Sequence, residues 1–482
     1  MASLDEIRQT RLEKKEKLKK NGIDPYPASV DFDNYINKIT DNFKEEEQVT
    51  IMGRVMSFRS LGMLVFFDLY DGTGKIQGLI KKDEIGEEQF NLFVGTIDIG
   101  DFVGIKGKTF ITKKGEQTIA VSEWKILTKS LRPLPEKWHG IKDAEERYRK
   151  RYLDLLMNKE VKDLFIKKTE FWKVVREFFQ TRDFMEVETP MLEVTAGGAE
   201  AKPFLTHHND FDIDLYLRIS VGELWHKRLM VAGFPKTFEI GRIFRNEGTS
   251  SEHLQEFTNL EFYWAYADYE DGMKLSQELY RQIAKDVFGT TKFELKNYKF
   301  DLADEWIKVD YQQEILKQTG IDVLVATEEE MKNKLSELKI KYEGENKERL
   351  TDTLWKYCRE KIAGPAFLIN HPKLVAPLAK MKRDNSELTE RFQIILAGSE
   401  IGNGFSELND PIDQRERFEA QQKLLQKGDG EAMMPDWEFV EAMEYGIPPA
   451  CGFGFGERLF WILAGVSGRE GTLFPLMRPK EG

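Results

Sequence analysis

The sequence FEIGRIFRNEGTSSEHLQEFTNLEFYWAYADYED, residues 238–271, contains two runs rich in aromatic and β-branched residues, separated by a polar loop of about eight residues. This pattern predicts two antiparallel strands. Because side chains alternate between the faces of a strand, Leu260, Phe262 and Trp264 share one face, which can pack against helices. The opposite face carries four residues of a different kind, namely Arg245, Glu247, Glu261 and Tyr263.

Charged side chains at strand centres on the covered side of a sheet are costly unless they bind something. An exposed, salt-bridged sheet face is the alternative interpretation. We favour a binding site, because an arginine and a tyrosine lie among the carboxylates.

This segment resembles motif 2 of the class II aminoacyl-tRNA synthetases, through FRNEG and the following Glu-Phe-Thr. Four other stretches resemble the same family and its lysyl-tRNA synthetase branch, in the expected order. They are the OB-domain run GRVMSF…DLYDGTGKIQ (53–77), the motif 1 region FMEVETPMLEV and its following strands (184–220), the lysine-branch stretch SEIGNGFSELNDPIDQRERF (399–418), and motif 3, GFGFGERLFWILAG (452–465), with LFPLMRP (473–479).

Short strands with turn signals between them fill residues 49–128 and predict a small closed barrel, with the OB-fold as the candidate. The later part mixes helices and strands and predicts an α+β catalytic domain, an antiparallel sheet flanked by helices. We therefore expect four parts: an N-terminal helical extension (1–45), an anticodon-binding OB-fold (46–130), a linker (131–150), and a class II catalytic domain (151–482) with an inserted helical region at about 305–360.

The composition excludes several classes of protein. The chain has 482 residues, 41% of them hydrophobic, and no apolar run long enough for a membrane span. Cys358 and Cys451 are its two cysteines, which excludes a disulfide scaffold and fits a reducing cytoplasm. A net charge of −12 argues against bulk nucleic-acid binding. The cation-rich residues 1–22 are interpreted as a solvated helix or as a basic arm for a phosphate backbone.

The resemblance implies a two-step, ATP-dependent reaction. Lysine attacks the α-phosphate of ATP, and the lysyl group then passes from the adenylate to the 3′ end of a lysine-accepting tRNA. It also implies Mg²⁺, a homodimer formed through motif 1, and a cytoplasmic location without membrane attachment. Neither step needs a nucleophilic side chain, because catalysis rests on positioning and charge stabilisation.

The resemblance also assigns roles to residues. Arg245 and Arg458 are the implied catalytic residues, at the α- and γ-phosphates. The other implied ATP contacts are Glu247, His253, Phe257 and Glu400. The ε-ammonium of lysine would meet Glu261, Tyr263 and Glu407, its α-amino group Gly198 and Glu223, and its carboxylate Arg245 and Asn403. Because Asn403, Phe405 and Glu407 share strand parity, we expect Phe405 to line the same pocket.

The implied magnesium ligands are Glu400 and Glu407. The second carboxylate of the family stands seven residues before Glu400, where this chain has Gln393. A neutral amide is a weaker partner for a cation, so the sequence leaves the number of metal ions open.

In the OB domain the resemblance implies that Arg54, Phe66 and Gln77 contact the anticodon, with base stacking on Phe66. The alternative is that Phe66 belongs to the barrel core and Gln77 to an ordinary surface.

Three other functions compete with lysine–tRNA ligation. An aspartate or asparagine ligase binds an acidic or amide side chain, so it would need cationic groups where this chain has Glu261, Tyr263 and GNGFSELND. An enzyme that lysylates a protein would lack the OB domain. A non-catalytic tRNA-binding paralogue is disfavoured by Arg245, Arg458 and Glu400, and favoured by Gln393.

Overall fold

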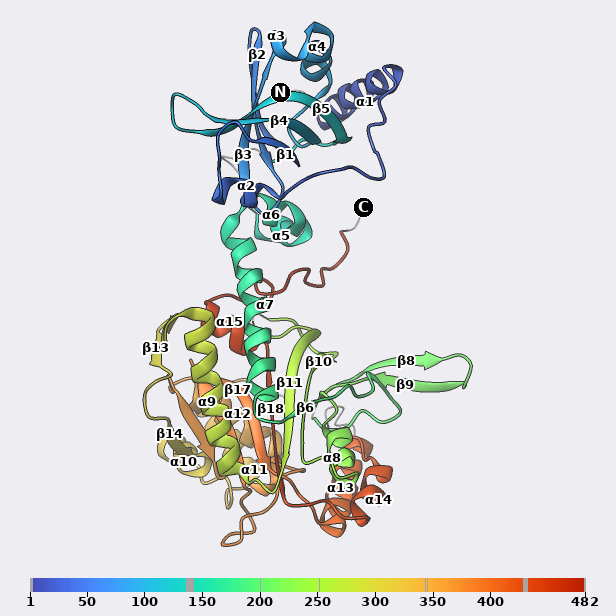
Figure 1. Ribbon diagram of the computed structural model, residues 1–482. Coiled ribbons are helices and arrows are strands. Elements are labelled where there is room, and N and C mark those ends of the chain that lie inside the picture. Colours follow the sequence, from blue (N-terminus) through green and yellow to red (C-terminus); the bar gives the residue numbers. More distant parts are fainter. Residues whose placement is uncertain are drawn as a thin grey trace. The chain divides into compact units, whose positions relative to one another are not determined.

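The computed structural model describes residues 3–135, 143–199, 201–250, 252–342, 344, 346–427 and 432–480. The chain divides into two compact units, Met1–Lys142 and Asp143–Gly482. Each unit is described by itself (Figure 1). No helix among the described residues is both long enough and apolar enough to span a membrane.

The first unit is a closed five-stranded barrel, as the sequence predicts. Its strand order is β1-β2-β3-β5-β4. The strands are β1 (Gln48–Leu61), β2 (Leu64–Tyr70), β3 (Lys75–Lys81), β4 (Phe102–Ile111) and β5 (Gln117–Thr128). In the described part of this unit, four helices accompany the barrel: α1 (Leu4–Lys20), α2 (Ile36–Asp41), α3 (Lys82–Ile85) and α4 (Glu87–Thr96). Alternate residues of each strand, such as Ile51, Val65 and Phe67, fill the barrel interior.

The N-terminal helix α1 uses two of its cations to dock within its own unit. Arg11 is buried and donates hydrogen bonds to the carbonyl groups of Ile99, Ser130 and Arg132. Lys14 Nζ lies 2.6 Å from a carboxylate oxygen of Asp98. These two side chains therefore anchor the helix.

The second unit is built on an eight-stranded sheet, which confirms the α+β prediction. The order is β14-β15-β16-β17-β18-β11-β10-β6, and all pairs are antiparallel except β14-β15 and β10-β6. The strands are β6 (Met185–Glu186), β10 (Lys236–Phe244), β11 (Glu256–Ala265), β14 (Ile307–Asp310), β15 (Ala366–Ile369), β16 (Arg391–Leu396), β17 (Ser399–Ser406) and β18 (Ala450–Gly456). Two small sheets complete the unit: β12 (Lys292–Leu295) with β13 (Tyr298–Asp301), and β7 (Leu192–Glu193), β9 (Ile213–Leu217) and β8 (Phe204–His208).

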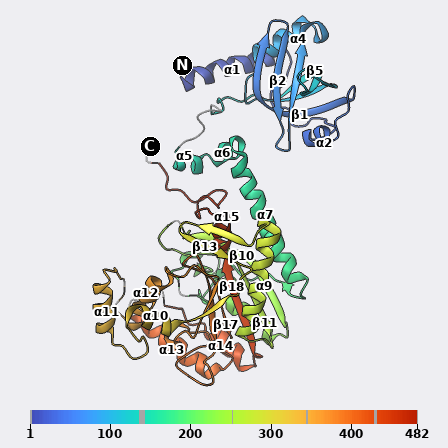
Figure 2. The same ribbon diagram turned by 90° about the vertical axis from the view of Figure 1, so that its left-hand side faces the viewer.

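Helices cover one face of this sheet. The long helices α7 (Lys159–Gln180) and α9 (Tyr269–Phe288) lie side by side, with α15 (Arg458–Ala464) nearby (Figures 1 and 2). Leu260 and Phe262 of β11 point into the core beneath them, together with Phe453 and Phe455 of β18. The predicted alternation along β11 is thereby confirmed, and its other face is free to form a site.

The remaining helices lie around the sheet. They are α5 (Ala144–Arg149), α6 (Arg151–Met157), α8 (Glu223–Val231), α10 (Tyr311–Thr319), α11 (Glu328–Glu337), α12 (Lys347–Arg359), α13 (Pro411–Gln426) and α14 (Trp437–Glu444), with a 3₁₀ turn at Lys373–Val375. Helices α10, α11 and α12 pack around a core of their own, which includes Met331, Leu354 and Trp355. Within the segment predicted as a linker, residues 143–150 belong to the second unit and residues 136–142 lie outside the described part.

One local prediction about the strands is wrong. The first run was expected to continue as a strand through Glu247, but β10 ends at Phe244. The amide of Arg245 still donates to the Gln255 carbonyl at 2.8 Å. The next amide, of Asn246, donates instead to Lys202 at 2.7 Å, which leads the chain away from β11. Arg245 and Glu247 therefore project from the loop that follows the strand.

Candidate active site

A cavity of about 590 Å³ lies on the face of β11, β17 and β18 opposite the aromatic core. Every residue predicted to bind ATP, lysine or metal lines this one cavity. These residues are Gly198, Glu223, Arg245, Glu247, His253, Phe257, Glu261, Tyr263, Gln393, Glu400, Asn403, Phe405, Glu407 and Arg458. They come from segments more than 200 residues apart, which the sheet brings together.

The floor of the cavity is the glycine face of β18. Phe453 and Phe455 point into the core, so Gly452, Gly454 and Gly456 point into the cavity. A Cβ atom on Gly452 would overlap the Glu407 carboxylate, and one on Gly454 would lie 2.8 Å from Glu261 Cγ. The alternating Gly and Phe residues therefore let acidic side chains of the neighbouring strands lie across β18.

One end of the cavity is acidic. Glu261 accepts hydrogen bonds from the Val221 amide at 2.8 Å and from the Tyr263 hydroxyl at 2.9 Å. Glu407, only 1% exposed, lies with one oxygen 2.6 Å from Lys227 Nζ. Within the described residues, neither oxygen of Glu407 accepts a hydrogen bond of good geometry. A buried carboxylate in this state can receive the N–H donors of an ammonium ligand.

Lys227 joins two of the acids. Its Nζ atom donates to Glu223 at 2.9 Å, one helical turn earlier on α8, and forms the ion pair with Glu407. Gly222 precedes the helix in the left-handed conformation, with φ at 68°, and a Cβ there would overlap Thr189. This turn places Glu223 at the cavity.

Burial shifts the protonation of these acids. Desolvation, then the nearby Glu223 charge, raises the pKa of Glu261 to about 7. Desolvation also raises the pKa of Glu407 to about 8, although Lys227 acts in the opposite direction. Because the charged forms are destabilised in the free chain, a bound ammonium group would stabilise them.

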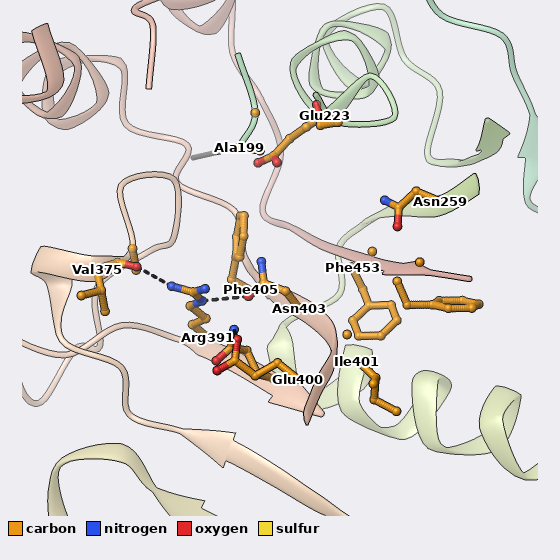
Figure 3. Close-up of a pocket in the computed structure, with 18 of the residues that line it drawn as sticks. Ala199, Glu223, Asn259, Val375, Arg391, Glu400, Ile401, Asn403, Phe405 and Phe453 are labelled. Carbon is orange, nitrogen blue, oxygen red and sulfur yellow. Dashed lines mark hydrogen bonds between the residues drawn. The ribbon is translucent and has the colours of Figure 1, made fainter. Parts of the chain in front are cut away.

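The centre of the cavity holds two arginines. Arg245 reaches the Ile219 carbonyl at 3.4 Å, and its guanidinium lies 5.6 Å from the Phe257 ring centroid. Arg391 donates to Asn403 Oδ1 at 2.8 Å and to the Val375 carbonyl, as Figure 3 shows. Asn403 is therefore held with its amide nitrogen available to the cavity.

The end of the cavity opposite the acidic end holds a further arginine. Arg458, the first residue of α15, donates to the Glu252 carbonyl at 3.0 Å and approaches the Glu400 carbonyl at 3.5 Å. Desolvation, then the charge of Arg458, lowers the pKa of His253 to about 4, so the imidazole is neutral at pH 7.

Glu400 does not share a metal site with Glu407. Glu400 lies at the start of β17 and Glu407 directly follows its end, seven residues later, which is roughly 20 Å at the rise of a strand. The assignment of both residues as magnesium ligands stays a prediction, and at this separation they would not hold the same ion. Glu400 receives hydrogen bonds from Trp355 Nε1 at 2.6 Å and Gln393 Nε2 at 3.0 Å. Among the described residues, no group of three or more His, Cys, Asp or Glu side chains is arranged to hold a metal ion.

These residues fit one magnesium ion that ATP carries on its own phosphates, with Glu400 as its single carboxylate contact. They do not fit a further ion held by a pair of carboxylates. The amide of Gln393 is already used, since its oxygen lies 3.0 Å from His371 Nε2 and its nitrogen donates to Glu400.

On the barrel, Arg54, Phe66 and Gln77 share the outer face of neighbouring strands. Phe66 alternates with the buried Val65 and Phe67, so its ring lies outside the barrel core. The alternative that Phe66 is core is wrong. Gln77 is 9% exposed, and its amide contacts Glu116 and Thr118. Arg54 stacks over Phe102 at 4.2 Å.

Comparisons with known proteins identify the family of this chain. The family model "tRNA synthetases class II (D, K and N)" matches residues 143–478. This chain belongs to that family. A model for the "OB-fold nucleic acid binding domain" matches residues 49–127. A lysine–tRNA ligase of Thermotoga maritima is 45% identical over 99% of this chain and 97% of its own length. Ligases of the same name from Thermosipho africanus and Moorella thermoacetica are each 44% identical, over 99% of this chain and 97% and 99% of theirs.

Several cavity residues of this class II chain escape prediction from the sequence. Arg391, Trp355 and Arg359 line the cavity, and Lys227 lies behind it, paired with its lining residues Glu223 and Glu407. For Lys227 a signal existed, because it follows Glu223 by four residues, the spacing of side chains that are neighbours on a helix. Trp355 and Arg359 belong to the inserted helices, and no local pattern connects them with Glu400.

Proposed function

We propose that this protein attaches L-lysine to its cognate tRNA in an ATP-dependent reaction that passes through lysyl-adenylate. The observation that carries the proposal is the buried acidic end of the cavity, formed by Glu261, Tyr263 and Glu407. A side-chain ammonium fits this end beside Lys227, whereas an acidic or amide side chain would leave the buried carboxylate of Glu261 without a cation. The lysine–tRNA ligases named above support the same substrate.

In the first step, the substrate carboxylate lies between Arg245 and Asn403, and its α-amino group lies near Gly198 and Glu223. A carboxylate oxygen attacks the α-phosphorus of ATP, and the bond from that phosphorus to the bridging oxygen breaks. Pyrophosphate leaves beside His253 and Arg458. Arg245 offers a planar fork of donors to the charge that develops on the α-phosphate. Magnesium bound to ATP and contacting Glu400 would neutralise part of the phosphate charge.

In the second step, a hydroxyl group at the 3′ end of tRNA attacks the carbonyl carbon of the adenylate, and AMP leaves. The chain contributes positioning in both steps. Glu247 and Phe257 would hold the adenine, and Phe405 would flank the aliphatic part of lysine.

Further proposals concern assembly and location. The small β7–β9 sheet exposes apolar side chains, which support a homodimer formed through this region; they are Met191, Leu192, Val194, Leu205 and Phe211. Cys358 and Cys451 are both free and buried, which suits a cytoplasmic protein.

ATP–pyrophosphate exchange, measured without tRNA across all twenty amino acids, tests the proposal. We expect exchange with lysine and none with aspartate or asparagine. Exchange with one of those two would show that the acidic end is misassigned, and no exchange with any amino acid would favour a non-catalytic paralogue.

Phe66→Ala tests the role of the barrel. We expect the variant to lower the kcat/KM for tRNA about tenfold, because base–aromatic stacking contributes about 1–3 kcal/mol, and to leave exchange unchanged. Phe58→Ala is the control, because Phe58 packs against the barrel core and stacks on Phe93, so this variant shows what a loss of barrel packing alone does to charging. Equal losses of exchange and charging would show that Phe66 supports the fold instead of the anticodon.

A further inference from the structure

Helix α12 turns one face toward the cavity. Asp352, Trp355, Lys356 and Arg359 line it, and their spacing of three or four residues places them on the same side of the helix. This helix belongs to the inserted group α10–α12, and the roles proposed above involve none of its residues.

Among the described residues, Arg359 is a largely buried cation without a close hydrogen-bond acceptor. Its side chain is 18% exposed, and its nearest carboxylate oxygen, on Glu400, lies 3.5 Å from Nη1. A charge-assisted hydrogen bond would be about 2.7–2.9 Å long. The Nε atom is buried and has no hydrogen-bond partner in the described part of the chain. Buried donors of this kind are rarely left unsatisfied in native proteins, so a missing acceptor is expected.

The neighbouring anions already have partners. Glu400 accepts from Trp355 and Gln393, and Asp352 pairs with Lys356 at 2.7 Å. Glu252 accepts a hydrogen bond from Ser399 at 3.1 Å. The missing acceptor for Arg359 is therefore a ligand rather than one of these side chains.

The surroundings of Arg359 identify the ligand as a polyphosphate. Arg458 approaches the carbonyl of Glu400, whose carboxylate faces Arg359. After burial, the positive charges of Arg458 and Arg359 both depress the pKa of His253, so the three groups share one region. Gln393 supplies no charge here, so no second carboxylate holds an extra cation against the phosphates. A guanidinium can neutralise them directly.

We propose that Arg359 binds the terminal phosphates of ATP and the pyrophosphate that leaves, so that α12 forms the phosphate wall of the cavity. This inference rests on the proposed function, because it adds a residue to the same ATP site. It assigns to the inserted helices a direct part in adenylate formation.

Arg359→Ala tests the inference through equilibrium binding of ATP, AMP, pyrophosphate and lysine, each titrated separately with magnesium in excess. We expect ATP and pyrophosphate to bind at least about tenfold more weakly, because the variant loses a hydrogen bond to a charged group. Affinities for AMP and lysine should stay within about twofold, because neither ligand has β- and γ-phosphates. Arg359→Lys keeps the positive charge but loses the planar guanidinium group. Its affinity for ATP and pyrophosphate should therefore lie between those of Arg359→Ala and the parent.

Lys361→Ala is the matched control. Lys361 stands two residues further along, stacks on Tyr357 at 4.3 Å and does not line the cavity. We expect its ATP affinity to equal that of the parent. Unchanged ATP and pyrophosphate binding in Arg359→Ala would overturn the inference. Equal weakening of AMP and ATP would also overturn it, because it would show that Arg359 supports the shape of the whole nucleotide site and not the terminal phosphates. If the parent itself binds no ATP, the proposed function fails instead.

Discussion

Arg245→Ala is expected to lower lysine-dependent ATP–pyrophosphate exchange by about 10³-fold or more, the size of effect seen when an arginine that stabilises a phosphoryl-transfer transition state is removed. The side chain stands between the acidic end and the phosphate end of the cavity, held near the Ile219 carbonyl and the Phe257 ring. In the proposed mechanism it is the group that contacts both reacting partners, the carboxylate and the α-phosphate. Its loss therefore removes positioning and charge stabilisation together.

Two companion variants separate this role from folding. Arg242→Ala removes an exposed arginine three residues earlier on β10, outside the cavity, and should exchange normally. Arg245→Lys keeps a positive charge without the planar fork and should remain well below the parent. Near-normal exchange in Arg245→Ala, with an unchanged melting temperature, would refute the assignment.

The binding face of the sheet was predictable because strand geometry is local. Alternation along β11 separates Glu261 and Tyr263 from Leu260 and Phe262, and nothing elsewhere in the fold can reverse that separation. The parity of Asn403 and Phe405 on β17 is equally local. Both strands therefore present the predicted residues to the cavity.

Other parts of the site depend on contacts that the sequence does not encode locally. Lys227 became part of the acidic end because α8 brings it to Glu407, which lies 180 residues later in the chain. Arg359 reaches Glu400 only because α12 packs beside the sheet. The end of β10 was missed because a tertiary hydrogen bond, from Asn246 to Lys202, replaces the strand pairing. In each case the determining partner is distant in sequence.

Glu407→Gln is expected to weaken lysine binding by about 10²-fold, because removing one partner of a buried charge pair costs about 2–5 kcal/mol. The amide has nearly the same shape as the carboxylate but carries no charge for the ε-ammonium. ATP should bind with unchanged affinity, since Glu407 directly follows the end of β17 and Glu400 lies at its start. Glu416→Gln, an exposed change on α13, is the control. An equal loss of ATP affinity would show that Glu407 supports the structure of the whole cavity.

The same variant should change the pH dependence of lysine binding. In the free chain the pKa of Glu407 is about 8 and that of Glu261 about 7, so part of the acidic end is protonated near neutral pH. The ε-ammonium stays charged throughout this range, since its pKa is about 10.4, and it favours the ionised acids. Binding therefore lowers both pKa values and releases protons. The affinity for lysine should reach its maximum above about pH 8 and fall as the pH drops through 8 and then 7, by about tenfold per pH unit for each acid.

Calorimetry in buffers of different ionisation enthalpy counts the protons that lysine binding releases. Glu407→Gln should abolish the release near pH 8 and retain the release near pH 7 from Glu261; a pH profile identical to that of the parent would show that Glu407 does not titrate with the ligand.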